Sequence, residues 1–120
     1  MQDILKVLAI SGSTRAGSYN RGLIRATAEL APNFVEIEEY DISDIPFYNG
    51  DVEAAGIPAP VLDLVERIRA ADAVLIATPE YNYAIPGILK NSVDWVSRPS
   101  VMNPLRHKPV AIMGLSLIHI

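Results

Sequence analysis

The sequence predicts an α/β fold, in which a doubly wound and mainly parallel β-sheet carries helices on both faces. Aliphatic runs of strand length alternate along the chain with amphipathic segments of helix length. Two of these runs, residues 4–10 and 73–77, are almost continuously apolar, as strands buried on both faces are. Each is followed by a turn rich in hydroxyl side chains, Gly or Pro. In parallel sheets such turns hold the ligand.

The first half of the chain predicts a strand, a helix and a second strand. Residues 4–10 form the first strand and lead into Ser-Gly-Ser. Residues 19–30 carry an apolar stripe at helical spacing, and a Pro closes the segment. Residues 34–40 alternate apolar and acidic side chains, which predicts a strand nearer an edge of the sheet. Residues 41–60 are rich in Pro and Gly without a clear period, so we expect a long loop.

The second half continues the alternation. The predicted elements are a helix opened by Pro60 and extending to Ala71, a strand at residues 73–77, a helix opened by Pro86 and extending over residues 87–96, a polar connection at residues 97–108, and a strand at residues 109–113. The resulting order is β-α-β-loop-α-β-α-β. Such alternation implies right-handed crossovers between parallel strands.

Composition narrows the classes of function. The chain has 120 residues, of which 50% are hydrophobic and 20% charged, and this suits a single domain with a core. The net charge of −4 argues against a nucleic-acid partner. The absence of cysteine excludes disulfides and thiolate chemistry. Because no apolar stretch approaches the ~20 residues of a membrane helix, we expect a cytoplasmic protein without a membrane partner.

The segment Ser11-Gly-Ser-Thr-Arg-Ala-Gly-Ser18 is a predicted anion-binding loop. It combines hydroxyl donors, two glycines and an Arg between a buried strand and a helix N-terminus, where unpaired N–H groups favour phosphate. The residue after the second glycine is Ser18 where a P-loop has Lys, and the glycines lack G-x-G-x-x-G spacing. A terminal monophosphate therefore suits this loop best. The alternative is a polar turn in which Ser18 caps the helix.

A second loop follows the strand at residues 73–77. Residues 78–87, Thr-Pro-Glu-Tyr-Asn-Tyr-Ala-Ile-Pro-Gly, offer planar side chains and amides on a rigid backbone. Such a loop can supply stacking surface and polar contacts to a flat ring. The alternative is a Pro-rich connector whose Tyr side chains pack on the next helix. In a sheet of order 2-1-3-4-5 both loops would face one site.

Four motifs taken together resemble the NADPH-dependent FMN reductase family. They are Ser11-Gly-Ser-Thr-Arg-x-Gly-Ser-Tyr-Asn20, Pro46-Phe-Tyr-Asn49, Thr78-Pro-Glu-Tyr-Asn82 and Pro86-Gly-x-Leu-Lys-Asn-x-x-Asp-Trp95. The resemblance runs from about residue 4 to residue 114. It implies a flavodoxin-like sheet of order 2-1-3-4 that lacks the family's fifth strand.

The resemblance also implies a cofactor, a set of contacts and an assembly. The cofactor would be FMN, and the helix at residues 86–95 with its flanking Tyr residues looks like the family's subunit contact in a homodimer or homotetramer. The residues expected to hold the FMN phosphate are Ser11, Ser13, Arg15, Ser18 and Asn20, with Tyr19 close by, and those expected to line the flavin ring are Pro79, Glu80, Tyr81 and Asn82.

The activity implied by the resemblance is transfer of hydride from NADPH or NADH to flavin N5, followed by electron transfer to small acceptors such as quinones. The alternative is a flavodoxin-like FMN-binding electron carrier. We assign no catalytic side chain, and we expect Glu80 to be structural. His107 and His119 lack partners at metal-ligand spacing, so no metal site is predicted.

The C-terminal end departs from the family pattern. After Gly114 the family has a small-residue loop and further elements, whereas this chain has Leu-Ser-Leu-Ile-His-Ile. Residues 1–114 are therefore interpreted as an incomplete FMN-binding domain, and residues 115–120 as a non-native tail. With the fourth strand left at an edge, we expect the isolated polypeptide to be unstable or insoluble and to bind FMN poorly, as a non-functional fragment would.

Overall fold

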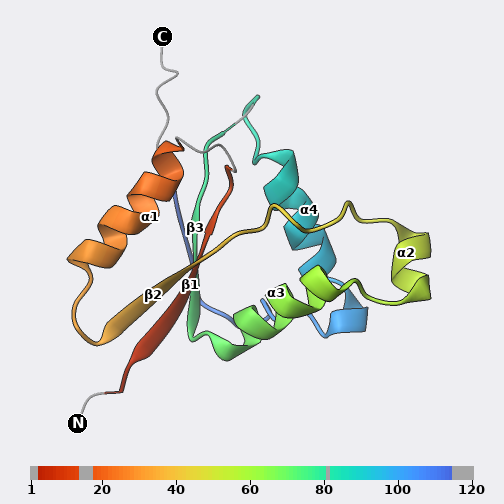
Figure 1. Ribbon diagram of the computed structural model, residues 1–120, viewed down its shortest axis with the longest axis horizontal. Helices are drawn as coiled ribbons and strands as arrows, with labels where there is room; N and C mark the ends of the chain where they lie inside the picture. The colour runs from red at the N-terminus through yellow and green to blue at the C-terminus, as the bar shows by residue number, and fades with distance from the viewer. Residues whose placement is uncertain (1–2, 14–17, 81, 115–120) are drawn as a thin grey trace.

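The computed structural model describes residues 3–13, 18–80 and 82–114. In this part of the chain four strands form one sheet, helices lie on both faces, and a short 3-10 helix precedes the last strand (Figure 1). The elements are β1 (Leu5–Ser11), α1 (Tyr19–Leu30), β2 (Val35–Tyr40), α2 (Gly50–Ala55), α3 (Ala59–Ala70), β3 (Ala73–Ala77), α4 (Gly87–Val96), η1 (Pro99–Val101) and β4 (Val110–Met113).

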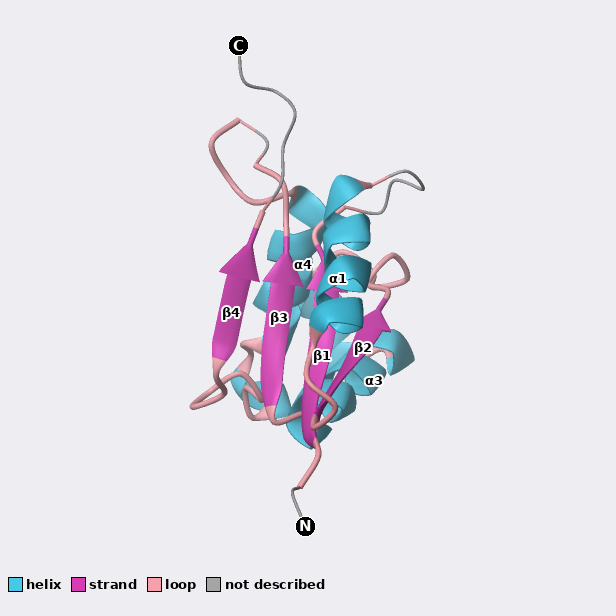
Figure 2. Ribbon diagram, turned by 90° about the vertical axis from the view of Figure 1, so that its left-hand side faces the viewer, coloured by secondary structure: helices cyan, strands magenta, loops and turns pink. Residues whose placement is uncertain are grey.

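The strands are all parallel and lie in the order β2-β1-β3-β4. Figure 2 shows that all four strands point the same way, so that their carboxyl ends lie together at one end of the sheet. The predicted doubly wound sheet of order 2-1-3-4 is confirmed, and so is the position of β2 at an edge. Among the described residues β4 is the other edge strand, and Ile112 on it is 71% exposed.

Two apolar layers hold the helices to the sheet. One layer lies between the sheet and α1, and it contains Ala9, Ile24 and Leu75. The larger layer lies on the other face, beneath α3 and α4. Alternate residues of β1 and β3 point into the two layers, which explains why both strands read as continuous apolar runs. Trp95 of α4 is fully buried in the larger layer.

Three details differ from the sequence prediction. The predicted loop at residues 41–60 contains the short helix α2, whose N-cap Asn49 accepts a hydrogen bond from the Asp51 N–H. Helix α3 begins at Ala59, one residue before Pro60, because Pro58 occupies the cap position. The connection at residues 97–108 contains η1. Helix α2 and η1 are short local structures without a periodic apolar pattern of their own.

The segment between β2 and α2 is fixed to α4 through one carbonyl group. The Pro46 carbonyl accepts hydrogen bonds from Asn91 Nδ2 at 2.9 Å and from Trp95 Nε1 at 2.7 Å. Asn91 Oδ1 in turn accepts from the Tyr48 N–H at 2.7 Å. The backbone on both sides of Phe47 is therefore held, while the Phe47 side chain is 84% exposed. Asn91 thus satisfies polar groups that a loop packed on a helix would otherwise leave unpaired.

Helix α2 is tied to η1 by the Glu53 carboxylate. It accepts hydrogen bonds from Ser100 Oγ at 2.6 Å, from Tyr48 Oη at 2.7 Å and from Arg98 Nε at 3.2 Å. The hydrogen bond from Ser100 and then that from Tyr48 hold the pKa of Glu53 at about 2, well below its usual range. Arg98 also lies over the Tyr48 ring, 5.3 Å from its centroid.

In the portion of the chain that the structure covers, every helix is too short or too polar to cross a membrane.

Replacing Asn91 by Ala should lower the free energy of unfolding by about 2–3 kcal/mol. The substitution removes two hydrogen bonds and leaves the Tyr48 N–H without its acceptor. Urea denaturation measures the change. The control is Lys90→Ala on the exposed side of the same helix, where loss of the Lys90–Asp94 pair should cost less than about 0.5 kcal/mol. Equal effects of the two substitutions would contradict the role given to Asn91.

The contribution of Glu53 to stability should depend on pH. Because folding lowers the pKa of this carboxyl, its contribution is present above the ordinary pKa of 4.5 and is lost as the pH falls toward about 2. The difference in unfolding free energy between the wild type and Glu53→Gln should therefore be constant near neutral pH and shrink across this interval. Ser100→Ala removes the leading donor, so it should move the loss to higher pH; a difference that stays constant down to pH 2 would count against this assignment.

Candidate functional site

The first predicted loop begins at the carboxyl end of β1 with a closed turn. Ser11 Oγ donates to the Ser13 carbonyl at 2.9 Å and accepts from the Ser13 N–H at 3.2 Å. Both residues are buried, with exposed fractions of 7% and 8%. The Ser11 hydroxyl therefore makes its hydrogen bonds within the loop, and these bonds fix the direction of the chain as it leaves the strand.

The described residues resume at Ser18, which is the N-cap of α1. Ser18 Oγ accepts a hydrogen bond from the Arg21 N–H at 3.4 Å, so Ser18 caps the helix, which was the alternative interpretation. The contact of Ser18 with a phosphate stays a prediction. Asn20 in the first turn is buried, with an exposed fraction of 3%, and the neighbouring Tyr19 is half exposed. Arg15 lies outside the described residues. The N-terminus of α1 begins here, and the positive end of a helix dipole favours an anion.

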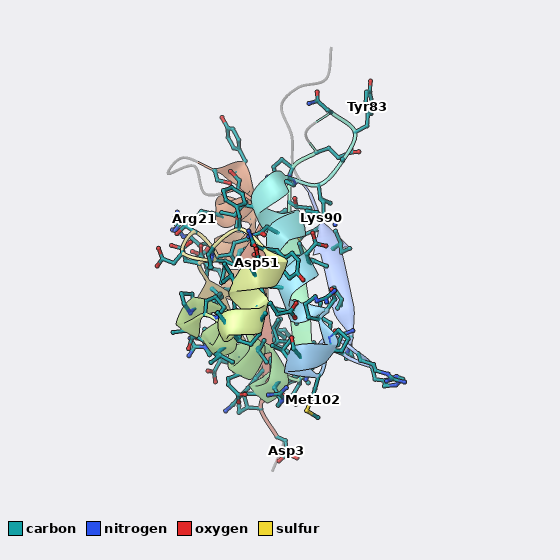
Figure 3. The ribbon with its side chains drawn as sticks, turned by 90° about the vertical axis from the view of Figure 1, so that its right-hand side faces the viewer. Asp3, Arg21, Asp51, Tyr83, Lys90 and Met102 are labelled. Carbon is teal, nitrogen blue, oxygen red and sulfur yellow. The ribbon has the colours of Figure 1, made fainter. Side chains whose placement is uncertain are left out.

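The second predicted loop leaves β3 at Thr78. Pro79 is partly buried, while Glu80 and Asn82 are exposed. Asn82 and Tyr83 both have positive φ, at 53° and 63°, so the chain turns sharply there. Tyr83 is 97% exposed and projects away from the sheet edge (Figure 3). Tyr81 lies outside the described residues. The alternative, in which the Tyr side chains of this loop pack on the next helix, does not hold for Tyr83.

The two loops meet directly at Gly12. A Cβ on Gly12 would lie 2.3 Å from Thr78 Oγ1 and 2.8 Å from Thr78 Cβ, and the Gly12 N–H donates to the Ala77 carbonyl at 2.8 Å. At the other side of Thr78, a Cβ on Gly114 would lie 2.7 Å from the Thr78 carbonyl oxygen. The ends of β1, β3 and β4 are therefore in contact without intervening side chains. The predicted convergence of the two loops on one edge of the sheet is confirmed at this point.

A small hollow beside the first loop contains residues that the sequence analysis did not single out. It has a volume of ≈ 50 Å³, and Arg21 and Glu39 line it together with Ser11, Ser13 and residues 40–43. Arg21 Nε lies 3.1 Å from Glu39 Oε1. Because α1 and β2 are separated by a turn, no spacing rule in the sequence links these two side chains. Alternation of acidic residues along β2 was the only available signal.

The pKa values of two side chains at this hollow are shifted. The Ser43 N–H donates to Asp41 Oδ1 at 2.9 Å, and this contact, with a smaller influence from Arg21, lowers the pKa of Asp41. Burial, followed by the hydrogen bond from its hydroxyl to Asp63, raises the pKa of Tyr40. Among residues 3–13, 18–80 and 82–114, no group of three or more His, Cys, Asp or Glu side chains comes together as metal ligands would.

The comparisons with known proteins agree on one family for this chain. The model of the NADPH-dependent FMN reductase family matches residues 5–119. An NAD(P)H-dependent FMN reductase of Pseudomonas aeruginosa is 53% identical over 116 residues, which cover 97% of this chain and 62% of that protein. A quinone reductase of Escherichia coli is 46% identical over 120 residues, covering 98% of this chain and 63% of that protein.

A solved structure gives the same result. FerB, a flavoenzyme NAD(P)H:(acceptor) oxidoreductase from Paracoccus denitrificans, matches with a TM-score of 0.87 and 41% sequence identity, over 94% of this chain and 62% of FerB. The chain thus spans somewhat less than two thirds of the length of the relatives it matches. Both the predicted resemblance and the flavodoxin-like fold are confirmed.

Replacing Gly12 by Ala should lower the free energy of unfolding by about 1–3 kcal/mol, because the new methyl group overlaps Thr78. The variant Thr78→Gly makes room, so the double variant should be more stable than the sum of the single effects by on the order of 1 kcal/mol.

The matched control for this cycle is Gly22→Ala in α1. No atom lies within 4 Å of a Cβ built there. This change should stabilise the chain by roughly 0.5–1 kcal/mol. Additive effects at Gly12 and Thr78 in urea denaturation would mean that the two loops do not constrain each other.

Proposed function

We propose, because the chain belongs to the NADPH-dependent FMN reductase family, that it binds FMN at the carboxyl edge of the sheet and passes electrons from NADPH or NADH to quinone-type acceptors. The observation that carries this proposal is the contact between Gly12 and Thr78. This contact supports the proposal, because it joins the first residues of the two loops whose sequences suit a phosphate and a flat ring.

The residues present suit FMN. Ser18 and the N-terminus of α1 offer donors to an anionic monophosphate, and the buried Ser13 and Asn20 stand on either side of the loop. Arg15 would add a permanent charge, as the family resemblance implies. Ser11 would act through the turn that it fixes with Ser13. This set recognises a phosphate without a γ-phosphate Lys, so a nucleoside triphosphate is a poorer match.

The second loop supports the proposed contact with the flavin ring. Pro79 and the positive-φ turn at Asn82 give a stiff backbone at the end of β3, from which Glu80 and Tyr81 would border the ring. When bound, FMN supplies the hydride and electron chemistry. The chain's own residues bind and orient it, and no side chain is required as an acid, base or nucleophile. Glu80 is exposed, which supports a structural contact for it.

A second copy of the chain would contact α4 and its flanking loops. Phe47, Tyr83 and Ile85 are exposed at 84%, 97% and 42%, and they flank this helix in sequence or by contact. Trp95 cannot take part, since it is fully buried in the core of its own chain. These side chains support a homodimer or homotetramer. The acidic, cysteine-free composition supports a cytoplasmic location.

The proposal predicts that the chain binds FMN more tightly than riboflavin, by on the order of tenfold or more, because the phosphate interacts with the first loop. Titration of either flavin, followed by quenching of its fluorescence, measures this ratio even when both affinities are weak. Equal affinities for the two flavins would remove the basis for a phosphate site.

Steady oxidation of NADPH or NADH in the presence of FMN and a quinone distinguishes the enzyme from an electron carrier. A carrier would bind FMN without this turnover. Because the chain covers 62% of the Pseudomonas aeruginosa relative, the assay is run in parallel on a chimera whose residues after Gly114 are those of that relative. Turnover by the relative but not by the chimera would contradict the assignment of the reductase activity to residues 3–114.

A further inference from the structure

Arg21 is a cation beside the predicted phosphate loop that the family motifs do not include. It lies in the first turn of α1, and its N–H donates to Ser18 Oγ, the N-cap of that helix. In Figure 3 it lies at the end of the sheet that carries Tyr83, opposite the end that carries Met102 and Asp3. Because helical side chains tilt toward the N-terminus, a long side chain at this position reaches back toward the loop.

The Arg21 guanidinium is bound to Glu39, near the carboxyl end of β2. Nε donates to Glu39 Oε1 at 3.1 Å, and both side chains are partly buried, with exposed fractions of 32% and 29%. Arg25, one turn further along α1, lies 3.7 Å from the other oxygen of the same carboxylate and is 62% exposed. A pair at this depth is screened less by solvent than a surface pair is.

The pair shares a hollow with the start of the phosphate loop. Arg21 and Glu39 line the same ≈ 50 Å³ space as the buried Ser11 and Ser13. Asp41 lines it as well, and Arg21 contributes to the lowered pKa of this carboxyl after the hydrogen bonds from Ser43. The field of Arg21 therefore reaches across the hollow.

Four charged side chains, three that line the hollow and Arg25 behind Glu39, have formal charges that cancel. Arg21 and Arg25 supply two positive charges, and Glu39 and Asp41 supply two negative ones. An anion that approaches the first loop meets no net attraction from this group as long as Glu39 is charged. Removal of Glu39 would leave a net positive charge, and removal of Arg21 would leave a net negative one. Each unit charge acts on a nearby phosphate with an energy that falls with distance and with salt.

We propose that Arg21 is a phosphate-recognition residue of this site and that Glu39 weakens its attraction for the phosphate. This inference rests on the proposed function, because it takes the phosphate of FMN as the anion. The bond to Glu39 uses the Nε–H, which is one of several donors of the guanidinium, so Arg21 can attract the phosphate while it keeps its partner. The Arg21–Glu39 pair thereby sets how strongly the site prefers FMN over riboflavin.

A purely structural role of the pair predicts a different outcome. If Arg21 and Glu39 only tie α1 to β2, loss of either partner loosens the same contact, and both substitutions weaken FMN binding. If the charge of Arg21 acts on the phosphate, the two substitutions have opposite effects. The sign of the Glu39 effect therefore separates the two roles.

The experiment compares the affinities of FMN and riboflavin for the full chain and its variants by fluorescence titration at low and high salt. Glu39→Gln should tighten FMN binding by about threefold to tenfold at low salt, and Arg21→Gln should weaken it by a similar factor. Riboflavin affinity should stay unchanged in both, and salt should reduce both effects. Arg21→Lys keeps the charge, so it should retain most of the FMN affinity and shows whether a loss in Arg21→Gln reflects charge rather than folding.

Glu38→Gln is the matched control. Glu38 is the neighbouring residue of β2, and it pairs with Arg67 on the other face of the sheet. Its substitution removes the same formal charge as Glu39→Gln. Its substitution should leave the ratio of FMN to riboflavin affinity within about twofold of the wild type. An equal effect of Glu38→Gln and Glu39→Gln would mean that net charge alone acts, and this would overturn the inference.

Three further outcomes would also overturn it. They are weaker FMN binding in both Glu39→Gln and Arg21→Gln, no change in either, and equal changes for FMN and riboflavin. In each of these cases the unsubstituted chain still prefers FMN, so the proposed function stands. If the unsubstituted chain does not distinguish FMN from riboflavin, the proposed function fails together with the inference.

Discussion

The contact between the carboxyl ends of β1 and β3 is the constraint on which the candidate site depends. These two strands are the central pair of the sheet, and their first loop residues, Gly12 and Thr78, pack without space for another carbon atom. The close packing fixes the starting points of both loops relative to each other. Since apolar layers cover both faces of the two strands, neither start can move without disturbing the core.

The same constraint bears on how a chain with a net charge of −4 would attract the proposed phosphate. Charge averaged over the whole surface repels it, so attraction has to come from the backbone dipole of α1 and from local cations. A loop that leaves a buried strand and enters a helix supplies the dipole at a fixed position. The Ser11–Ser13 turn and the Ser18 cap are the two contacts that set this position on either side.

The sequence was sufficient to predict those elements whose pattern lies within one short segment. Continuous apolar runs identified β1 and β3, helical spacing identified α1 and α3, and a Pro at the first helical position identified α4. The Ser18 cap was the alternative to a phosphate contact of this residue. The sequence was insufficient to predict contacts between residues that are far apart along the chain. The Arg21–Glu39 pair, the Asn91 bonds to Pro46 and Tyr48, and the bonds from Arg98 and Ser100 to Glu53 span 18 to 47 positions. None has a spacing rule, because each depends on how the sheet brings its connections together.

Two of these sets of long-range contacts lie in the short stretch of chain that begins at Glu39 of β2. At its beginning, Glu39 binds Arg21 of α1, on one face of the sheet. A few residues later, Pro46 and Tyr48 bind Asn91 of α4, on the other face. The stretch thus links both helical layers at the edge where the phosphate and ring loops begin. Between the two attachments, the hydrogen bond from the Ser43 N–H to Asp41 closes a turn. The geometry of the site therefore depends on the packing of α1 and of α4 together.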